Sequence, residues 1–331
     1  MNITIYDIAQ KCNVSIATVS RVLNGSSRVS EKTKKHILEV MQEMGYKPNP
    51  FARGLGLDSM KIVGVVCTDI SDIFYAHAVS LLEEGLRKHH FDVMLSNTGT
   101  DTGRNSKYIT DMAAKHVDAI ITIGTPFSSE SDIRQLCSIA EHTPIITINS
   151  DYHQPNMYSV VCNEKDGMRN IVHKLAERNY HSILYIYDSL TYSGRQKLSG
   201  IQDGFRELEL TASSQLLYQI PRTLKDAETL IENLLTHNVY FDAIVTSEDV
   251  LAIGAQRAAR RRGRDIPVIG CNNSILAQCA TPTLTSLDNK LSSLCTAAVR
   301  IVMDLTGKEK ISVPVRTEFN AELVTRESFH L

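Results

Sequence analysis

The chain has 331 residues, of which 43% are hydrophobic and 22% are charged, and its formal net charge is −2. This composition is that of an ordinary globular protein, and the length exceeds what one core usually serves, so we predict a small module beside a larger two-lobed region. No apolar run could span a membrane and no secretory signal opens the chain, so we exclude a membrane protein and expect a cytoplasmic one. The seven cysteines lack CxxC spacing, so we also exclude a disulfide framework and a zinc site.

The charge is unevenly distributed along the chain. Residues 1–57 contain eight Lys or Arg against four Asp or Glu, a net charge of +4, and the remainder contains 27 against 33, a net charge of −6. A basic head on an acidic body suggests that the head meets an anion such as DNA. Chance variation in a small domain would give the same balance, so the charge alone does not decide.

Two short helices are predicted at the start of the chain, from Ile5 to Cys12 and from Ile16 to Leu23. Apolar residues recur on one face of each helix, Ser15 suits the N-cap of the second, and Asn13 tolerates the left-handed backbone that the turn needs. The second helix carries polar residues on its other face. This tight pair is typical of a helix-turn-helix whose second helix enters the major groove of DNA, and it favours that function over a three-helix bundle without a ligand.

A third helix is predicted from Glu31 to Met44, after Ser30 and before Gly45. The segment 49–58 follows it and is either a hinge helix or a plain linker. Its Asn-Pro start suits a helix, but two glycines make so short a helix unstable unless a partner copy and DNA order it.

The first 57 residues resemble the head of the lactose-repressor (LacI) family of bacterial transcriptional regulators. The resemblance rests on TIYDIA, VSIATVSRVLNG, VSEKT and GYKPNPFARGL, which together cover the whole head and hinge. These motifs are far more specific than a generic helix-turn-helix. They imply a regulator that binds operator DNA as a homodimer.

The resemblance also implies roles for single residues. Ile16 and Ala17 occupy positions that read base edges, and Arg21 occupies one that contacts a guanine, where its guanidinium can bond O6 and N7 together. Leu55 occupies the hinge position that wedges into the minor groove and kinks the duplex. The remaining predicted DNA contacts, which include phosphate-binding positions, are Thr4, Ser15, Thr18, Ser20, Asn24, Arg28 and Asn49.

Beyond the head, apolar runs alternate with helical patterns, which predicts parallel sheets covered by helices on both faces. The predicted strands are Ile62–Cys67, Phe91–Ser96, Ala119–Ile123, Pro144–Ile148, Tyr158–Cys162, Ile183–Tyr187, Ala243–Thr246 and Pro267–Gly270. The predicted helices include Ala76–His89, Asp166–Arg178, Ala227–Leu235 and Asp249–Arg262. The length suits two lobes with a ligand cleft between them, at the carboxyl ends of the strands.

This region resembles the two-lobed, periplasmic-binding-protein-like domain of the same family, through pieces such as IVGVV, HVDAIITIG, TPTLTSL and LVTRESF. The fold class that we predict is therefore α/β: an N-terminal three-helix helix-turn-helix head plus a two-lobed domain with parallel sheets. The expected domains are the head at 1–48, the hinge at 49–58 and an effector-binding and dimerisation domain at 59–331. Its N-lobe takes about 59–160 and 289–319, and its C-lobe takes about 161–288 and 320–331.

The family binds its effector at recurrent positions, which the resemblance transfers to loops after the predicted strands. Aromatic side chains there could stack on a sugar, and polar groups could pair with its hydroxyls. Each residue alone is as easily explained by the core or a solvated helix start, but together on cleft-facing loops they favour a binding site. The predicted effector-binding residues are Asp72, Phe74, Tyr75, Asn149, Tyr192, Arg195, Lys197, Glu248, Asp249 and Asn272.

The cleft departs from the family pattern in one respect. The family usually has Asp where Asn272 stands, and often Asp where Asn149 and Cys162 stand. Fewer carboxylates, together with Arg195 and Lys197, predict a less acidic cleft. We therefore expect a sugar-like effector that carries negative charge, a sugar acid or a sugar phosphate.

Two rival functions are less favoured. A solute-binding protein for transport would share the cleft, but it needs export and would not begin with a DNA-binding head. An enzyme is disfavoured because no GxxxxGK[ST], HExxH or GxSxG motif occurs. We expect no catalytic residue, no cofactor, no metal site and no membrane partner. Repression is the expected outcome of DNA binding.

Overall fold

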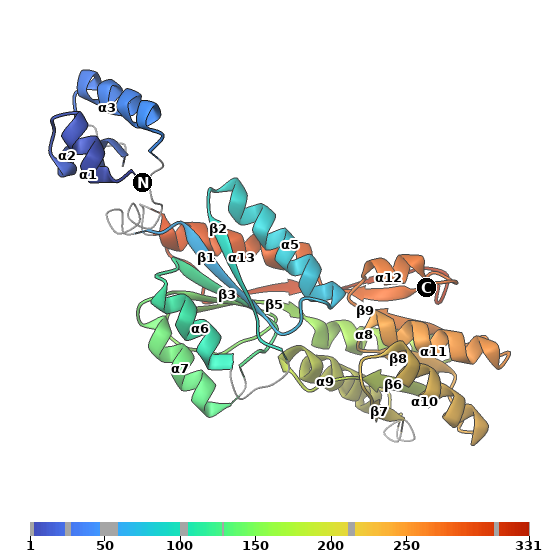
Figure 1. Cartoon of the computed structure of the whole chain (residues 1–331). Helices are drawn as coiled ribbons and strands as arrows, with labels where there is room; N and C mark the ends of the chain where they lie inside the picture. The colour runs from blue at the N-terminus through green and yellow to red at the C-terminus, as the bar shows by residue number, and fades with distance from the viewer. Residues whose placement is uncertain are drawn as a thin grey trace.

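The computed structural model describes residues 3–23, 28–46, 59–99, 105–127, 129–210, 216–307 and 311–330. They form a three-helix head and a larger body with two sheets (Figure 1). No helix in these ranges is long and apolar enough to cross a membrane.

The head contains α1 (Ile5–Lys11), α2 (Ile16–Leu23) and α3 (Glu31–Met44). Local signals set these bounds. Asn13 adopts a left-handed φ of 51° in the turn, and Gly45 does so at 67° to end α3. At the start of α3 the Thr33 N–H donates to Ser30 Oγ. The core of the head consists of Ile8, Ala9, Cys12, Val19, Val22, Ile37, Val40 and Met41.

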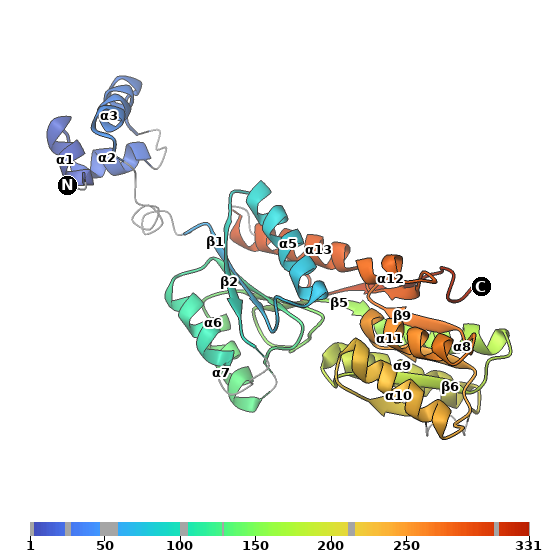
Figure 2. The same ribbon diagram turned by 45° about the vertical axis from the view of Figure 1, so that its right-hand side comes forward.

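The first lobe is built on a six-stranded sheet of order β11-β5-β4-β3-β1-β2, in which all five pairings are parallel. Its helices cover both faces, with α5 and α13 together on one and α6 and α7 on the other (Figures 1 and 2). The elements are β1 (Ile62–Cys67), α5 (Ile73–Lys88), β2 (Asp92–Asn97), α6 (Asn105–Ala114), β3 (Ala119–Ile123), α7 (Glu130–Ala140), β4 (Ile145–Ile148), β5 (Met157–Asn163), α13 (Leu291–Thr306) and β11 (Arg316–Asn320).

The second lobe has a sheet of order β12-β10-β9-β8-β6-β7, parallel except for β12 against β10. One face packs on α8 and α9, and the other on α10, α11 and α12. The elements are α8 (Glu164–Glu177), β6 (Ile183–Tyr187), α9 (Tyr192–Glu207), β7 (Leu217–Gln219), α10 (Leu224–Thr236), β8 (Ala243–Thr246), α11 (Asp249–Arg261), β9 (Val268–Cys271), α12 (Ile275–Cys279), β10 (Thr285–Asp288) and β12 (Glu322–Val324).

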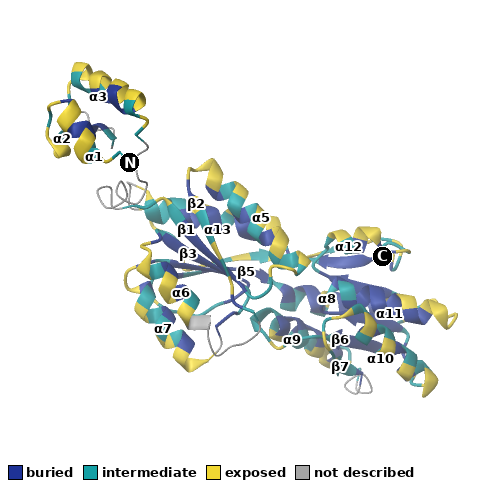
Figure 3. Ribbon diagram, in the orientation of Figure 1, coloured by how far each residue is buried: buried dark blue, intermediate teal, exposed yellow. Residues whose placement is uncertain are grey.

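The chain passes between the two lobes three times. It leaves the first sheet after β5, returns to the first lobe between β10 and α13, and leaves again between β11 and β12. The central strands of both sheets are buried (Figure 3), as parallel strands covered on two faces must be. Two-sided burial explains why these strands are continuous apolar runs in the sequence.

Candidate nucleic-acid interface and ligand cleft

The helix α2 has one buried face and one exposed face. Val19 and Val22 are buried in the core of the head, whereas Ile16, Ala17 and Arg21 are exposed. Ile16 exposes 42% of its surface. The three predicted base-reading residues therefore share one solvent-facing side of a short helix.

Several predicted DNA-binding hydroxyls take part in helix caps. The Thr18 N–H donates to Ser15 Oγ, and the two hydroxyls lie 2.8 Å apart. Thr4 Oγ1 donates to Asp7 Oδ2 at 2.7 Å, within the capping box of α1. These bonds hold the hydroxyls at the ends of α1 and α2, on exposed or partly exposed residues.

The other predicted DNA contacts are less informative. Ser20 is partly buried and Arg28 is exposed. Asn24, Asn49 and Leu55, and the predicted hinge at 49–58, lie outside the described residues.

The polar residues that follow the strands of both sheets meet in one cleft. An inner cavity of about 440 Å³ lies there. Its wall is made by residues from loops or helix starts after β1, β3, β4, β6, β7, β8, β9 and β10: Thr68, Phe74, Tyr75, Gly124, Thr125, Asn149, Asp188, Ser189, Thr191, Ser193, Lys197, Arg222, Glu248, Asn272 and Asn289. An adjoining cavity of about 1030 Å³ shares Phe74, Arg222, Glu248 and Asn272 with it.

Eight of the ten predicted effector-binding residues line these two cavities. Six belong to the inner wall, and Asp72 and Asp249 line the adjoining cavity. Tyr192 and Arg195 line neither. The Tyr192 N–H donates to Thr125 Oγ1 at 3.3 Å, and Arg195 donates to the backbone oxygen of Leu190.

Arg222 is the most important wall residue that the sequence did not reveal. Its guanidinium lies 3.4 Å from Asp72 Oδ2, 3.7 Å from Asp188 Oδ2 and 3.9 Å from Glu248 Oε2. It follows β7, a three-residue edge strand whose sequence carries no clear strand signal, so the loop after it was not recognised as part of the cleft.

Lys197 is 3% exposed and lies within the wall of the inner cavity. Its ammonium donates to the Ser247 backbone oxygen at 3.0 Å and lies 3.5 Å from Glu164 Oε1 and 3.6 Å from Glu248 Oε1. A buried ammonium needs such partners because desolvation is costly. Lys197 is therefore occupied by protein groups.

Glu248 lies between the two cations of the cleft. Burial raises its pKa to about 7, the negative charges of Asp188 and Asp72 add to the increase, and Lys197 and Arg222 oppose it. Asn272 Nδ2 donates to the Glu248 carboxylate at 2.6 Å.

Asp249 has a supporting part in the same region. Its carboxylate accepts bonds from Ser286 Oγ at 2.6 Å and from the Ser274 N–H and Oγ at 2.7 Å each. These bonds tie the start of α11 to the loop after β9, and they leave the side chain little capacity for a ligand.

The described wall of the cleft has more acids than bases. The two cavities are lined by Asp72, Asp188, Glu248, Asp249 and Asp288 against Lys197, Arg222 and Lys290. Lys197 lies within 4 Å of Glu164 and Glu248, and Arg222 lies within 4 Å of Asp72, Asp188 and Glu248. Such a wall offers hydrogen-bond acceptors and amides to a ligand, and it has little attraction for an anion.

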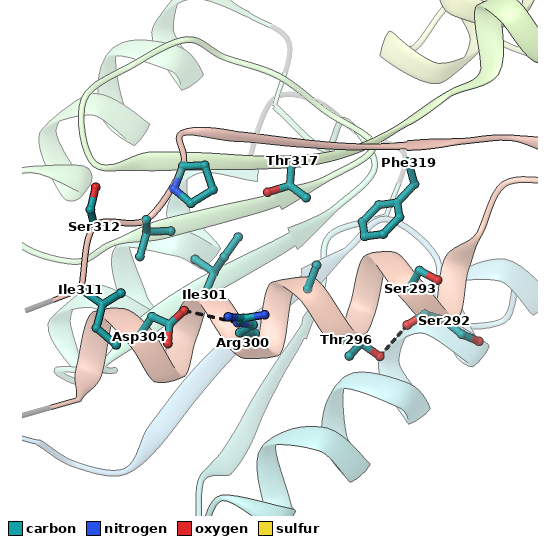
Figure 4. A pocket seen from close by; sticks show the side chains of 13 residues that line it. Ser292, Ser293, Thr296, Arg300, Ile301, Asp304, Ile311, Ser312, Thr317 and Phe319 are labelled. Atoms are coloured by element: carbon teal, nitrogen blue, oxygen red, sulfur yellow. Dashed lines mark hydrogen bonds and ion pairs between the residues drawn. The ribbon is translucent and has the colours of Figure 1, made fainter. Parts of the chain in front are cut away.

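A separate groove of about 690 Å³ lies between α13 and β11 in the first lobe (Figure 4). Apolar side chains such as Ile301, Val313 and Phe319 line it, and Arg300 faces Asp304 beside it. None of the predicted site residues belongs to its wall. Among the described residues, no group of three or more His, Cys, Asp or Glu side chains could hold a metal ion.

Comparisons with known proteins agree on one family. The family model described as bacterial regulatory proteins, lacI family, matches residues 4–49, and the periplasmic binding protein-like domain matches residues 172–329. An HTH-type transcriptional regulator of Lachnoclostridium phytofermentans is 41% identical, with 98% of each chain covered.

Two solved structures share the fold. One is the lac repressor dimer bound to operator and the anti-inducer ONPF, with a TM-score of 0.85, 21% identity and 99% of each chain covered. The other is the complex of the transcriptional regulator CelR with cellobiose, with a TM-score of 0.71, 23% identity and coverage of 99% of this chain and 100% of that one.

The raised pKa of Glu248 predicts a pH dependence of stability. Because the folded pKa of about 7 exceeds the ordinary value of 4.5, the contribution of this group to stability is complete below pH 4.5 and is lost as the pH rises through 7. Glu248→Gln removes the titration. The free energy of unfolding of the native chain should therefore fall, relative to the variant, by up to about 3 kcal/mol between pH 5 and pH 8.

Urea unfolding at several pH values measures this difference. Glu177→Gln, at the exposed end of α8, is the matched control and should keep the native pH dependence. Parallel pH profiles for the native chain and Glu248→Gln would contradict the prediction.

Proposed function

The chain belongs to the LacI family of bacterial regulatory proteins and is a DNA-binding transcriptional regulator, and we propose that it represses transcription in the cytoplasm by binding a palindromic operator as a homodimer under the control of a small sugar-like effector. The observation that carries the DNA-binding part is the exposed side of α2 with Ile16, Ala17 and Arg21. The net charge of +4 in residues 1–57 supports it. The relative that shows the family is a transcriptional regulator, not an enzyme.

We assign residues 1–48 to reading DNA, 49–58 to the hinge, and 59–331 to effector binding and dimerisation. The lac repressor structure is a dimer on operator DNA, and a chain of the same fold supports the same assembly here. Two heads related by a two-fold axis read inverted half-sites, so the operator should be palindromic. Ligand in the cleft acts by binding one arrangement of the lobes more tightly than the other.

The effector that we propose is an uncharged sugar. The expectation of an anion rests on Lys197 and Arg195, and both cations already have protein partners. Lys197 pairs with buried carboxylates, and Arg195 donates to a backbone oxygen. The acidic wall suits a polyol whose hydroxyls donate to carboxylates and whose ring packs on Phe74. CelR is solved with the neutral sugar cellobiose, which agrees with this chemistry. A sugar acid or sugar phosphate is the second candidate.

The proposed role of α2 in reading DNA predicts that one substitution strongly lowers the affinity for DNA. Selection of the full-length protein on random duplex DNA should enrich a palindrome. Arg21→Ala should weaken binding to that palindrome about 10- to 100-fold, because a bidentate contact to guanine is lost. Lys11→Ala removes an equal charge from exposed α1 and should weaken binding much less. Fluorescence anisotropy at physiological salt measures both, and an equal effect of the two substitutions would show that Arg21 acts only through its charge.

The effector class is tested by calorimetric titration of the full chain. At least one of the neutral sugars glucose, cellobiose and sucrose should bind, whereas the anionic glucose 6-phosphate and glucuronate should bind more weakly or not at all. Phe74→Ala should weaken that binding, and Tyr240→Ala, 68% exposed before β8 at the sheet edge opposite the cleft, should leave it unchanged. Binding of the anionic sugars alone would contradict the proposal of an uncharged effector.

A further inference from the structure

A third cavity of about 440 Å³, which we call the distal cavity, lies in the second lobe at the end opposite the effector cleft. Its wall joins the end of α8, the last turns of α11, the loops before β9 and β10, and the chain after β12. The cleft, in contrast, lies at the carboxyl ends of the strands. Figure 1 shows α11 running away from the first lobe toward this end. None of the residues assigned to DNA or to the effector belongs to the wall of the distal cavity.

Three arginines in this wall have no protein partner. The side chains of Arg178, Arg260 and Arg264 are exposed and make no ion pair or hydrogen bond with any described residue. Arg261, which follows Arg260 in the chain, instead pairs with two glutamates of α10. The guanidinium groups beside the cavity therefore remain available to a ligand.

Two carboxylates also belong to the wall of the distal cavity. One of them, Glu327, accepts bonds from the Thr283 N–H at 2.8 Å and from Thr283 Oγ1 at 2.9 Å, so it is engaged with the protein. The other, Asp265, is exposed. Three guanidinium groups against two carboxylates leave the wall with a net positive charge, which attracts an anion.

Gln256 is the feature of the wall that a solvated basic surface would not need. It is 4% exposed, lies among buried residues of α11, and its amide makes no hydrogen bond with any described residue. The amide is not fully enclosed, because what remains accessible of it opens on the cavity. Arginines at the ends of α8 and α11 would complement the helix dipoles without a ligand, but a dipole does not explain a buried amide. An unpaired buried amide is costly, so we expect a ligand to bond it.

The remaining wall is largely apolar and partly flat. Tyr180 packs edge-on against Phe329, with ring centroids 6.4 Å apart, and Pro267 and Pro282 lie beside them. The volume is within the range of small-molecule pockets. The cavity therefore suits a ligand with an anionic group and a flat organic body.

We propose that the distal cavity binds a small phosphate ester with a flat organic part, a nucleoside monophosphate. Guanidinium groups of Arg178, Arg260 and Arg264 bond the phosphate oxygens, often two at a time. The Gln256 amide donates to the ligand, and the base packs on Tyr180 and the prolines. This site is separate from the effector cleft and does not depend on the proposed function.

Calorimetric titration of the full chain with AMP, adenosine and inorganic phosphate tests the proposal. AMP should bind more tightly than either of its parts. Arg260→Gln should weaken AMP binding about tenfold, because a charged hydrogen bond is lost. Arg261→Gln removes an equal charge one residue away, outside the wall, and should leave the affinity for AMP unchanged. No binding of AMP, equal binding of AMP and adenosine or phosphate, or equal effects of the two substitutions would overturn the site.

Gln256→Leu separates a binding role from a structural one. If the amide serves the ligand, this variant should bind AMP more weakly while its thermal midpoint without AMP stays the same or rises, because a buried unpaired amide is removed. A lowered midpoint with unchanged AMP affinity would overturn the role of Gln256. Phe74→Ala, in the wall of the effector cleft, should leave AMP binding unchanged, and a loss there would overturn the distal site by placing AMP in the cleft.

Discussion

The carboxyl ends of two parallel sheets face the same space because the chain passes between the lobes three times. Strands that run the same way end at the same edge, so the loops after them gather their polar side chains there. The three passages bring the two edges opposite each other. Residues as distant in sequence as Asp72 and Arg222 thus come within 3.4 Å. The cleft, its charges and the contacts across it all follow from this arrangement.

Charge inside that space determines what it can bind. Placing Lys197 and Arg222 among four carboxylates satisfies both cations without a ligand. The wall therefore offers acceptors to the hydrogen-bond donors of a ligand. Burial raises the pKa of Glu248 to about 7, and the nearby charges of Asp188 and Asp72 add to the increase. The charged residues on the cleft loops led us to expect an anionic effector, because the sequence does not show which protein groups pair with Lys197 and Arg195.

Local signals in the sequence predicted much of the fold. The bounds of α2 and α3 were predicted to the residue, because Ser15 and Ser30 start helices and Gly45 ends one. Buried strands such as β1 and β3 appear as continuous apolar runs. The sequence was silent where tertiary packing decides. The strand β11 has the exposed and charged sequence RTEFN, and α9 contains glycines that look like turns but allow close packing on α8. Arg222 was missed for the same reason, since only the sheet order places it near Asp72.

In the proposed function, closure of the cleft controls the binding of DNA by the head. An interlobe disulfide tests it without any knowledge of the effector, because Tyr192 and Thr125 already touch across the cleft. The variant Thr125→Cys/Tyr192→Cys should form a bond that locks the lobes when oxidised. Its affinity for the selected palindrome should then change at least tenfold between the oxidised and reduced states, and neither single variant should respond. Equal affinity in both states, with the crosslink verified by mass spectrometry, would show that closure of the cleft does not control DNA binding.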